Sequence, residues 1–182
     1  MKNITHSDLY SYQGKLWKVN ASTSGIRTDI FRSILGLVLS VNERHGKMFV
    51  FRFDLSVNEH TQNNGLIEHL VRRLSRRVKT HYKAKLFYFW VREQEKAKKQ
   101  HYHFFVILDG SKINRPNQLQ EWIRTIWEQY GRCHWSAYHN VSRQDTNSLR
   151  DVVYHLSYLA KSRGKGYRAA QVKDFGHSKG FV

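Results

Sequence analysis

The sequence predicts one α+β domain, in which an antiparallel sheet of the split β-α-β type is flanked by helices. Three observations support this prediction. Segments with helical and strand periodicity follow one another in the order helix, strand, helix, strand, strand, helix, strand, helix. Two consecutive strand-like segments are joined by a short polar loop, which is typical of a hairpin. The length of 182 residues suits one domain with a sizeable core.

The first part of the chain is predicted to differ from the rest. Residues 1–24 are polar with scattered aromatic side chains, and we expect a flexible N-terminal arm there. Residues 25–182 should then form the folded domain, ending in a mobile, basic, glycine-containing tail. Within the domain, apolar side chains at helical spacing over residues 30–41 predict a helix that ends near Gly46.

A strand and a second helix follow. Residues 47–57 alternate as a strand, so that the odd-numbered aromatic side chains face one way while Arg52 and Asp54 face the other. Those two charged residues either reach a functional site or lie at the edge of the sheet. Residues 66–82 have helical periodicity with a basic polar side, which we expect to contact DNA phosphates. The arginines of that side are Arg72, Arg73, Arg76 and Arg77.

The predicted hairpin contains the first candidate site. Side chains two apart on a strand share a face, so His101 and His103 should point the same way. If Glu93 lies opposite His101, its carboxylate joins the two imidazoles, and Glu95 has the same parity and could take its place. Two histidines and a carboxylate can hold a divalent metal, with Mn²⁺ or Mg²⁺ expected and Zn²⁺ also able to bind.

Because the chain has 11 histidines in 182 residues, a His-x-His pair alone is weak support for a site. A second motif strengthens it. After a predicted helix over residues 119–127 and a strand over residues 133–141, a further helix begins near Thr146. On that helix Tyr154 and Tyr158 are four residues apart and share one face, with Lys161 one turn further on.

The charge of the chain indicates the class of partner. The sequence has 31 Lys and Arg against 14 Asp and Glu, a formal net charge of +17, which favours a polyanion and nucleic acid first of all. Further contacts to DNA are expected in the hairpin loop and in the tail. These are Lys98, Lys99, Lys165 and Arg168.

Cysteine content and hydropathy indicate where the protein is expected to act. The single cysteine, Cys133, suits a reducing cytosol. The sequence has no apolar run of membrane-spanning length, so no membrane association is expected.

Several motifs resemble one known family. The His-Tyr-His motif of residues 101–103 followed by Tyr-Leu-Ala-Lys at residues 158–161 resembles the HUH endonucleases of rolling-circle replication. Together with M-F-V-F-R-F-D-L at 48–55, F-W-V-R-E-Q-E at 89–95 and D-F-G-H-S at 174–178, the sequence resembles the inovirus-type (filamentous phage) replication initiator family. The resemblance extends over residues 31–179.

The resemblance implies a structure and a reaction. The fold would be the RRM-like HUH core, with the histidine pair on a central strand and the tyrosine on a late helix. Tyr158 would attack a DNA phosphodiester and form a 5′-phosphotyrosine bond, Lys161 would supply positive charge, and Tyr154 would be either a second nucleophile or a supporting aromatic. The DNA would be single-stranded or extruded where it is cut.

The biological setting implied is the cytoplasm of a bacterial host cell. The DNA cut would be the origin of the protein's own mobile element or the genome of a competing phage. Because the sequence has no Walker A motif, a replicative role requires a separate helicase, and a separate polymerase would extend the new 3′ end. Two other classes stay open: a non-catalytic nucleic-acid-binding protein on the same fold, and a metal-dependent hydrolytic nuclease, which would form no covalent adduct.

Overall fold

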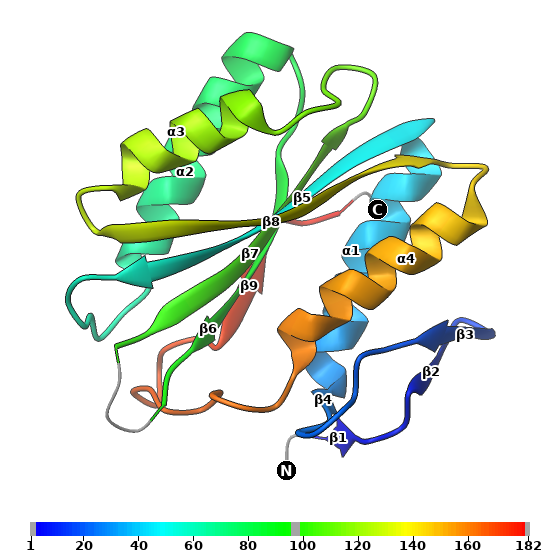
Figure 1. The fold of residues 1–182 in the computed structure, drawn as a ribbon, viewed down its shortest axis with the longest axis horizontal. Helices are drawn as coiled ribbons and strands as arrows, with labels where there is room; N and C mark the ends of the chain where they lie inside the picture. The colour runs from blue at the N-terminus through cyan, green and yellow to red at the C-terminus, as the bar shows by residue number, and fades with distance from the viewer. Residues whose placement is uncertain (1–2, 96–98, 181–182) are drawn as a thin grey trace.

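The computed structural model describes residues 3–95 and 99–180. It confirms the predicted α+β class, with helices on both faces of an antiparallel sheet (Figure 1). The main strands are β5 (Lys47–Val57), β6 (Phe87–Glu93), β7 (His101–Asp109), β8 (Gly131–Ser142) and β9 (Phe175–His177). The helices are α1 (Thr28–Arg44), α2 (Gly65–Tyr82), α3 (Asn117–Trp127), α4 (Thr146–Ser157) and the 3₁₀ turn η1 (Tyr158–Ala160).

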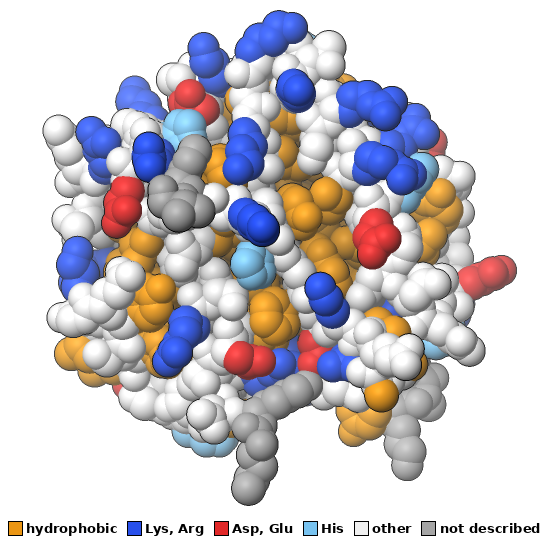
Figure 2. Space-filling model, turned by 180° about the vertical axis from the view of Figure 1, so that it is seen from behind, with side chains coloured by type: hydrophobic (Ala, Val, Ile, Leu, Met, Phe, Trp, Pro, Cys, Tyr) orange, Lys and Arg blue, Asp and Glu red, His pale blue; other side chains and the backbone are white. Residues whose placement is uncertain are grey.

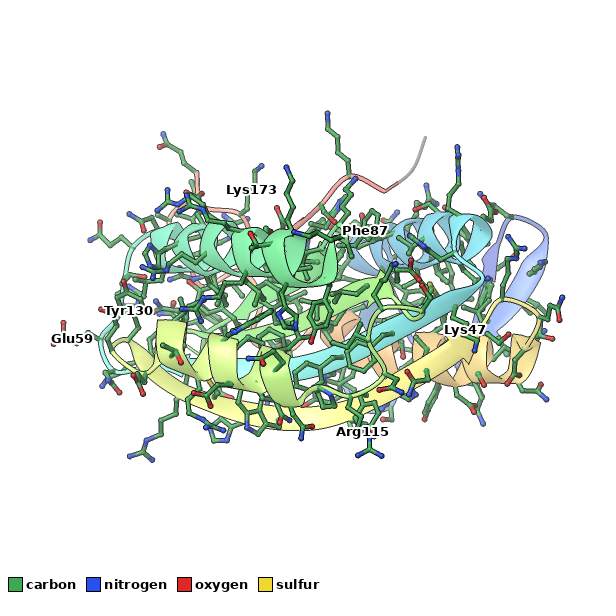
Figure 3. All side chains as sticks on the ribbon, turned by 90° about the horizontal axis from the view of Figure 1, so that it is seen from above. Lys47, Glu59, Phe87, Arg115, Tyr130 and Lys173 are labelled. Atoms are coloured by element: carbon green, nitrogen blue, oxygen red, sulfur yellow. The ribbon has the colours of Figure 1, made fainter. Side chains whose placement is uncertain are left out.

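The sheet has the strand order β8-β5-β7-β6-β9, and all of its neighbouring strands are antiparallel. Helices α2 and α3 cover one face, while α1 and α4 cover the other (Figure 1). Seen from above, α2 and α3 lie beside each other over one half of the molecule, and α1 and α4 over the other half (Figure 3). The sheet therefore separates two apolar cores.

Strand β5 shows how the sequence builds both cores, because its side chains alternate as predicted. Phe49, Phe51 and Phe53 are fully buried against α2 and α3, whereas Met48 and Val50 are buried against α1 and α4. Among the described residues, no helix has both the length and the apolar character needed to cross a membrane.

The N-terminal segment differs from the loose arm that was predicted. Strand β1 (Ile4–Thr5) pairs with β4 (Ile26–Arg27), and β2 (Leu9–Tyr12) forms a hairpin with β3 (Lys15–Lys18). The physical reason is burial: Trp17 on β3 is only 5% exposed and belongs to the core under α1 and α4. Burying a large apolar side chain contributes about 1.5–3 kcal/mol, which is enough to hold a short hairpin on the domain.

The C-terminal segment, predicted as a mobile tail, contains a strand. Strand β9 pairs with β6 and extends the sheet, and the rings of Phe175 and His177 stack on Phe89 with centroids 5.7 and 5.4 Å away. Before β9, the backbone carbonyl of Lys173 accepts a hydrogen bond of 3.1 Å from the Asn64 side chain at the start of α2 (Figure 3). The tail thus passes along the β6 edge of the sheet to the α2 layer.

Candidate metal centre and its tyrosine

The hairpin of β6 and β7 has the register that the sequence predicted. Glu93 lies opposite His101, and Val91 lies opposite His103. All three polar side chains project from the sheet face that α1 and α4 cover, because Val91 on the same strand face is buried in that core. The hairpin is long and mostly aromatic, which fixes this register through burial on both faces.

The side chains of Glu93, His101 and His103 converge. Glu93 Oε2 lies 3.3 Å from His101 Nε2 and 3.1 Å from His103 Nε2. One ligand atom from each residue falls within 4.8 Å of the others, so the cluster could hold a metal ion. The His103 side chain is 7% exposed and that of His101 is 41% exposed, which leaves one side of the cluster open to a substrate.

Behind His103 lies Asp54 of β5, a residue that the sequence placed on this face without assigning it to the site. Asp54 Oδ1 is 2.7 Å from His103 Nδ1, while His103 Nε2 faces Glu93. A carboxylate on the outer ring nitrogen fixes the tautomer and orientation of a metal-ligating histidine. Asp54 also faces Arg52 at 3.5 Å, so the charged end of β5 joins the cluster.

The pKa values of these groups show how strongly they interact. Burial opposes the charged form of Glu93, but hydrogen bonds from His101 and His103 hold the pKa of Glu93 far below its usual range. Burial disfavours charged His103, yet the hydrogen bonds to Asp54 and Glu93 outweigh it and raise the pKa of His103. In the metal-free state the histidine is therefore protonated more readily, and a bound metal would replace that proton.

A lysine of the tail reaches the same carboxylate. The side chain of Lys165 is 1% exposed, and its ammonium donates to Glu93 Oε1 and to the carbonyl of Lys161. Gly164 makes this possible: its φ is +71°, and its carbonyl accepts a 2.7 Å hydrogen bond from the Gln94 N–H, which turns the tail onto Glu93. Sequence reasoning placed Lys165 among the DNA contacts, whereas in the structure its side chain is buried against Glu93.

Tyr158 lies at the mouth of the cluster. Its ring is edge-on to His103 with centroids 5.5 Å apart, and the Arg52 guanidinium lies 4.5 Å from its centre. Lys161 Nζ is 5.1 Å from the same ring. The residue is 36% exposed, so part of its side chain can be reached from solvent. Pairing of Ile26 with Lys161 ties the end of η1 to β4 and fixes this position.

Tyr154 has different surroundings. It is 40% exposed, and Lys18 of the N-terminal hairpin has its Nζ 5.8 Å from the ring centre. The chain changes from α-helix to a 3₁₀ turn at Tyr158, so the two tyrosines do not continue one regular helical row. The structure thus brings Tyr158, and not Tyr154, into ring contact with the histidine cluster.

Two further histidines support Arg52 from behind. His155 Nε2 lies 3.3 Å from Arg52 Nη1, and His155 Nδ1 lies 2.9 Å from His139 Nε2. Burial and the neighbouring Arg52 lower the pKa of His155 to about 4. A neutral His155 can accept a hydrogen bond from Arg52 and hold it against Tyr158, which fits a supporting role better than metal ligation.

The remaining predicted contacts lie elsewhere. Lys99 donates to the Asn58 carbonyl, and Lys98 lies outside the described residues. Arg168 is paired with Asp174 and donates to two backbone carbonyls of the tail. Glu95, the alternative metal ligand, is paired with Arg163 at 2.9 Å.

The four predicted arginines of α2 lie on the opposite side of the sheet from Glu93. Arg72, Arg73 and Arg76 are exposed there, and Arg77 is half-buried. They are therefore not part of the metal cluster.

Comparison with known proteins gives a family. The family described as the YagK/YfjJ C-terminal domain matches residues 12–178, nearly the whole chain, and the chain belongs to it. No curated protein matches the sequence significantly. The matched range includes the metal cluster, Tyr158 and strand β9.

Proposed function

We propose that this member of the YagK/YfjJ C-terminal domain family is a metal-dependent DNA nickase that uses Tyr158 as its nucleophile. The observation that supports the proposal best is the position of Tyr158. Its ring lies against His103 of the candidate metal cluster, and the cationic groups of Arg52 and Lys161 are 4.5 and 5.1 Å from its centre. A nucleophile, a metal cluster and two cations at one place are the parts that phosphoryl transfer requires.

Glu93, His101 and His103 would hold the metal, for which we propose Mn²⁺ or Mg²⁺. Their two imidazole nitrogens and one carboxylate oxygen suit such an ion. Glu93 Oε2 faces the histidines while Oε1 faces Lys165, so the two oxygens can serve the metal and the lysine separately. When bound, the ion would neutralise charge on the scissile phosphate and orient it.

The residues of the chain account for the other parts of the reaction. The Tyr158 oxygen attacks the phosphorus in line, the bond between phosphorus and the 3′ oxygen breaks, and that oxygen takes up a proton as the phenol proton is lost. Arg52 and Lys161 balance charge on the phosphoryl oxygens. The products are a 5′-phosphotyrosine and a free 3′ hydroxyl, which allows later rejoining of the strand.

The DNA could belong to the protein's own mobile element or to a competing phage. In the first case the 3′ hydroxyl would prime rolling-circle replication by a separate polymerase and helicase. In the second case nicking would damage the competitor. To distinguish these two targets, purified protein is incubated with Mn²⁺ and supercoiled plasmids that carry either DNA. The positions of the nicks are then mapped.

The decisive test is covalent attachment. An oligonucleotide that spans the mapped nick, labelled on its 3′ side, should form a protein–DNA adduct that survives denaturing electrophoresis. Tyr158→Phe should abolish the adduct without changing the fold, and Tyr154→Phe is the matched control that should keep it. An adduct that depends on Tyr154 alone would contradict the assignment. Metal-dependent nicking without any adduct would indicate a hydrolytic nuclease, and DNA binding without nicking a non-catalytic protein.

A further inference from the structure

A second basic surface lies on the side of the sheet away from Tyr158. The outer face of α2 forms a hollow of about 340 Å³ that is lined entirely by basic or potentially basic side chains. These are His69, Arg72, Arg73, Arg76 and Arg77. Lys and Arg side chains gather over this part of the molecule, with few acidic groups among them (Figure 2). We name this surface the α2 arginine groove.

The arginines of the groove are arranged for binding phosphates. Arg72 and Arg76, and likewise Arg73 and Arg77, are four residues apart, so each pair repeats at one helical turn, about 5.4 Å. Among the described residues, none of the four arginines has a carboxylate within 4.0 Å. Guanidinium groups without acidic partners are available for bidentate contacts to phosphate oxygens.

The positive surface continues from the groove in two directions. At the C-terminal end of α2, Lys79, Lys83 and Lys85, together with apolar and aromatic neighbours such as Leu86 and Tyr88, line a separate depression of about 700 Å³. At the N-terminal end, the tail that comes from Lys161 and the metal cluster meets α2, where the carbonyl of the exposed Lys173 bonds to Asn64. Basic side chains therefore lie both where the tail meets α2, at Lys173, and along the outer face of α2.

The structure favours nucleic acid over an anionic membrane as the occupant. A membrane-surface helix inserts its apolar face between lipids. In α2 that face is formed by Ile67, Leu70, Leu74 and Val78, which are all 0% exposed because they pack on the sheet. Only the charged face is left for a partner.

The lining also favours a duplex over a single strand. Proteins that bind single-stranded DNA combine positive charge with aromatic side chains on which bases stack. The residues that line the α2 arginine groove include no Phe, Tyr or Trp. Contacts from arginines to backbone phosphates position a duplex without reading its sequence.

We propose that the α2 arginine groove binds the phosphate backbone of duplex DNA adjacent to the single strand engaged at Tyr158. This inference rests on the proposed function for its premise that the polyanion is DNA. It assigns the two faces of the sheet to two DNA forms: the α1/α4 side holds the strand to be cut, and the α2 side holds the flanking duplex.

The test measures binding without cleavage. Affinities for a blunt 25-base-pair duplex and for an unstructured 15-nucleotide strand are measured by fluorescence anisotropy in EDTA from about 50 to 200 mM salt. Arg72→Gln/Arg76→Gln should weaken duplex binding about tenfold and reduce its log–log salt slope by about 1.8, or about 0.9 for each phosphate that the variant no longer neutralises. Single-strand affinity should change less than about twofold. The matched control is Lys112→Gln/Arg115→Gln, two exposed basic residues before α3.

Three outcomes would overturn the proposal. The first is unchanged duplex affinity in Arg72→Gln/Arg76→Gln, and the second is an equal loss of affinity for duplex and single strand. The third is an equal loss of duplex affinity in the control variant, which would indicate a diffuse effect of net charge. Binding of phosphatidylserine vesicles that depends on Arg72 and Arg76, with duplex binding intact, would also overturn it in favour of a membrane. If the wild-type protein fails to nick DNA with Mn²⁺ but Arg72→Gln/Arg76→Gln still loses duplex binding selectively, the proposed function fails and this inference stands.

Discussion

The two faces of the central sheet are built from the same strands but differ in composition and role. On β5, Phe51 and Phe53 are closed into the core under α2 and α3, while Arg52 and Asp54 lie among the charged groups beside His103. The α1/α4 side buries apolar residues at one end of the strands and opens into a polar cluster at the other. Strand alternation thus lets both faces bury an apolar core, while the α1/α4 face also carries the candidate metal cluster. The variants below test that division.

The largest effect is expected on the α2/α3 side. Phe53 is fully buried and its ring stacks on Phe104 with centroids 5.0 Å apart. Phe53→Ala should lower the free energy of unfolding by about 3–5 kcal/mol because it leaves a cavity. Urea denaturation measures this, and Phe53→Leu should lose clearly less. A loss below about 1 kcal/mol for the alanine variant would mean that the packing around Phe53 contributes little to stability.

The next effect concerns metal removal on the opposite face. At a Mn²⁺ concentration of about 100 times its Kd, the ion should stabilise the wild-type protein by about 2.7 kcal/mol. His103→Ala should lose this metal-dependent rise in melting temperature while keeping most of the metal-free stability. His81→Ala, at the exposed end of α2, is the control that should keep it. Equal stabilisation of the His103 variant by Mn²⁺ would remove His103 from the metal centre.

A smaller effect is expected from the carboxylate behind the ligand. Asp54→Asn keeps the shape of the residue but weakens its hold on His103 Nδ1, which lies 2.7 Å away. Metal affinity measured by calorimetry should fall about 10–100-fold. Asp151→Asn, an exposed change on α4, should leave it unaltered. An unaltered affinity in the Asp54 variant would show that His103 is oriented by packing alone.

The smallest effect tests the alternative ligand. Glu95 is paired with Arg163 at 2.9 Å, with side chains 40% and 77% exposed respectively. Glu95→Gln should change stability by no more than about 1 kcal/mol, and metal affinity should stay within about twofold. Glu93→Gln makes the same chemical change two residues earlier, at the last residue of β6. This variant should abolish metal binding. If the two variants lose affinity equally, the assignment of Glu93 as the ligand is contradicted.

The sequence predicted best those features that depend on long, regular apolar patterns. The bounds of β5 agree with the predicted strand, and Glu93 lies opposite His101 as expected. Both follow from aromatic strands that are buried on two faces, where a shift of one residue would expose the core. The register then brings Glu93, His101 and His103 together without further information.

Features that depend on contacts distant in sequence were not predictable in this way. The strands of the N-terminal hairpin are four residues each, too short for a clear period, and the burial of Trp17 requires α1 and α4 to be in place. Lys165 reaches Glu93 only because the tail turns at Gly164 beside β6. Alternation placed Asp54 on the correct face, but only the pairing of β5 with β7 sets it beside His103.

The position of β5 between β8 and β7 has a consequence for how fast the protein folds. Its two partners, β7 and β8, come late in the chain, as the pairs Ser56↔His101 and Val57↔Gly131 show, and no neighbouring hairpin helps it to form. Each pairing requires closure of a long loop, whose entropy is lost before the contacts form. Folding is therefore expected on the millisecond-to-second timescale of proteins whose strand pairs are distant in sequence. During synthesis, β5 stays unpaired until β7 and β8 have emerged from the ribosome.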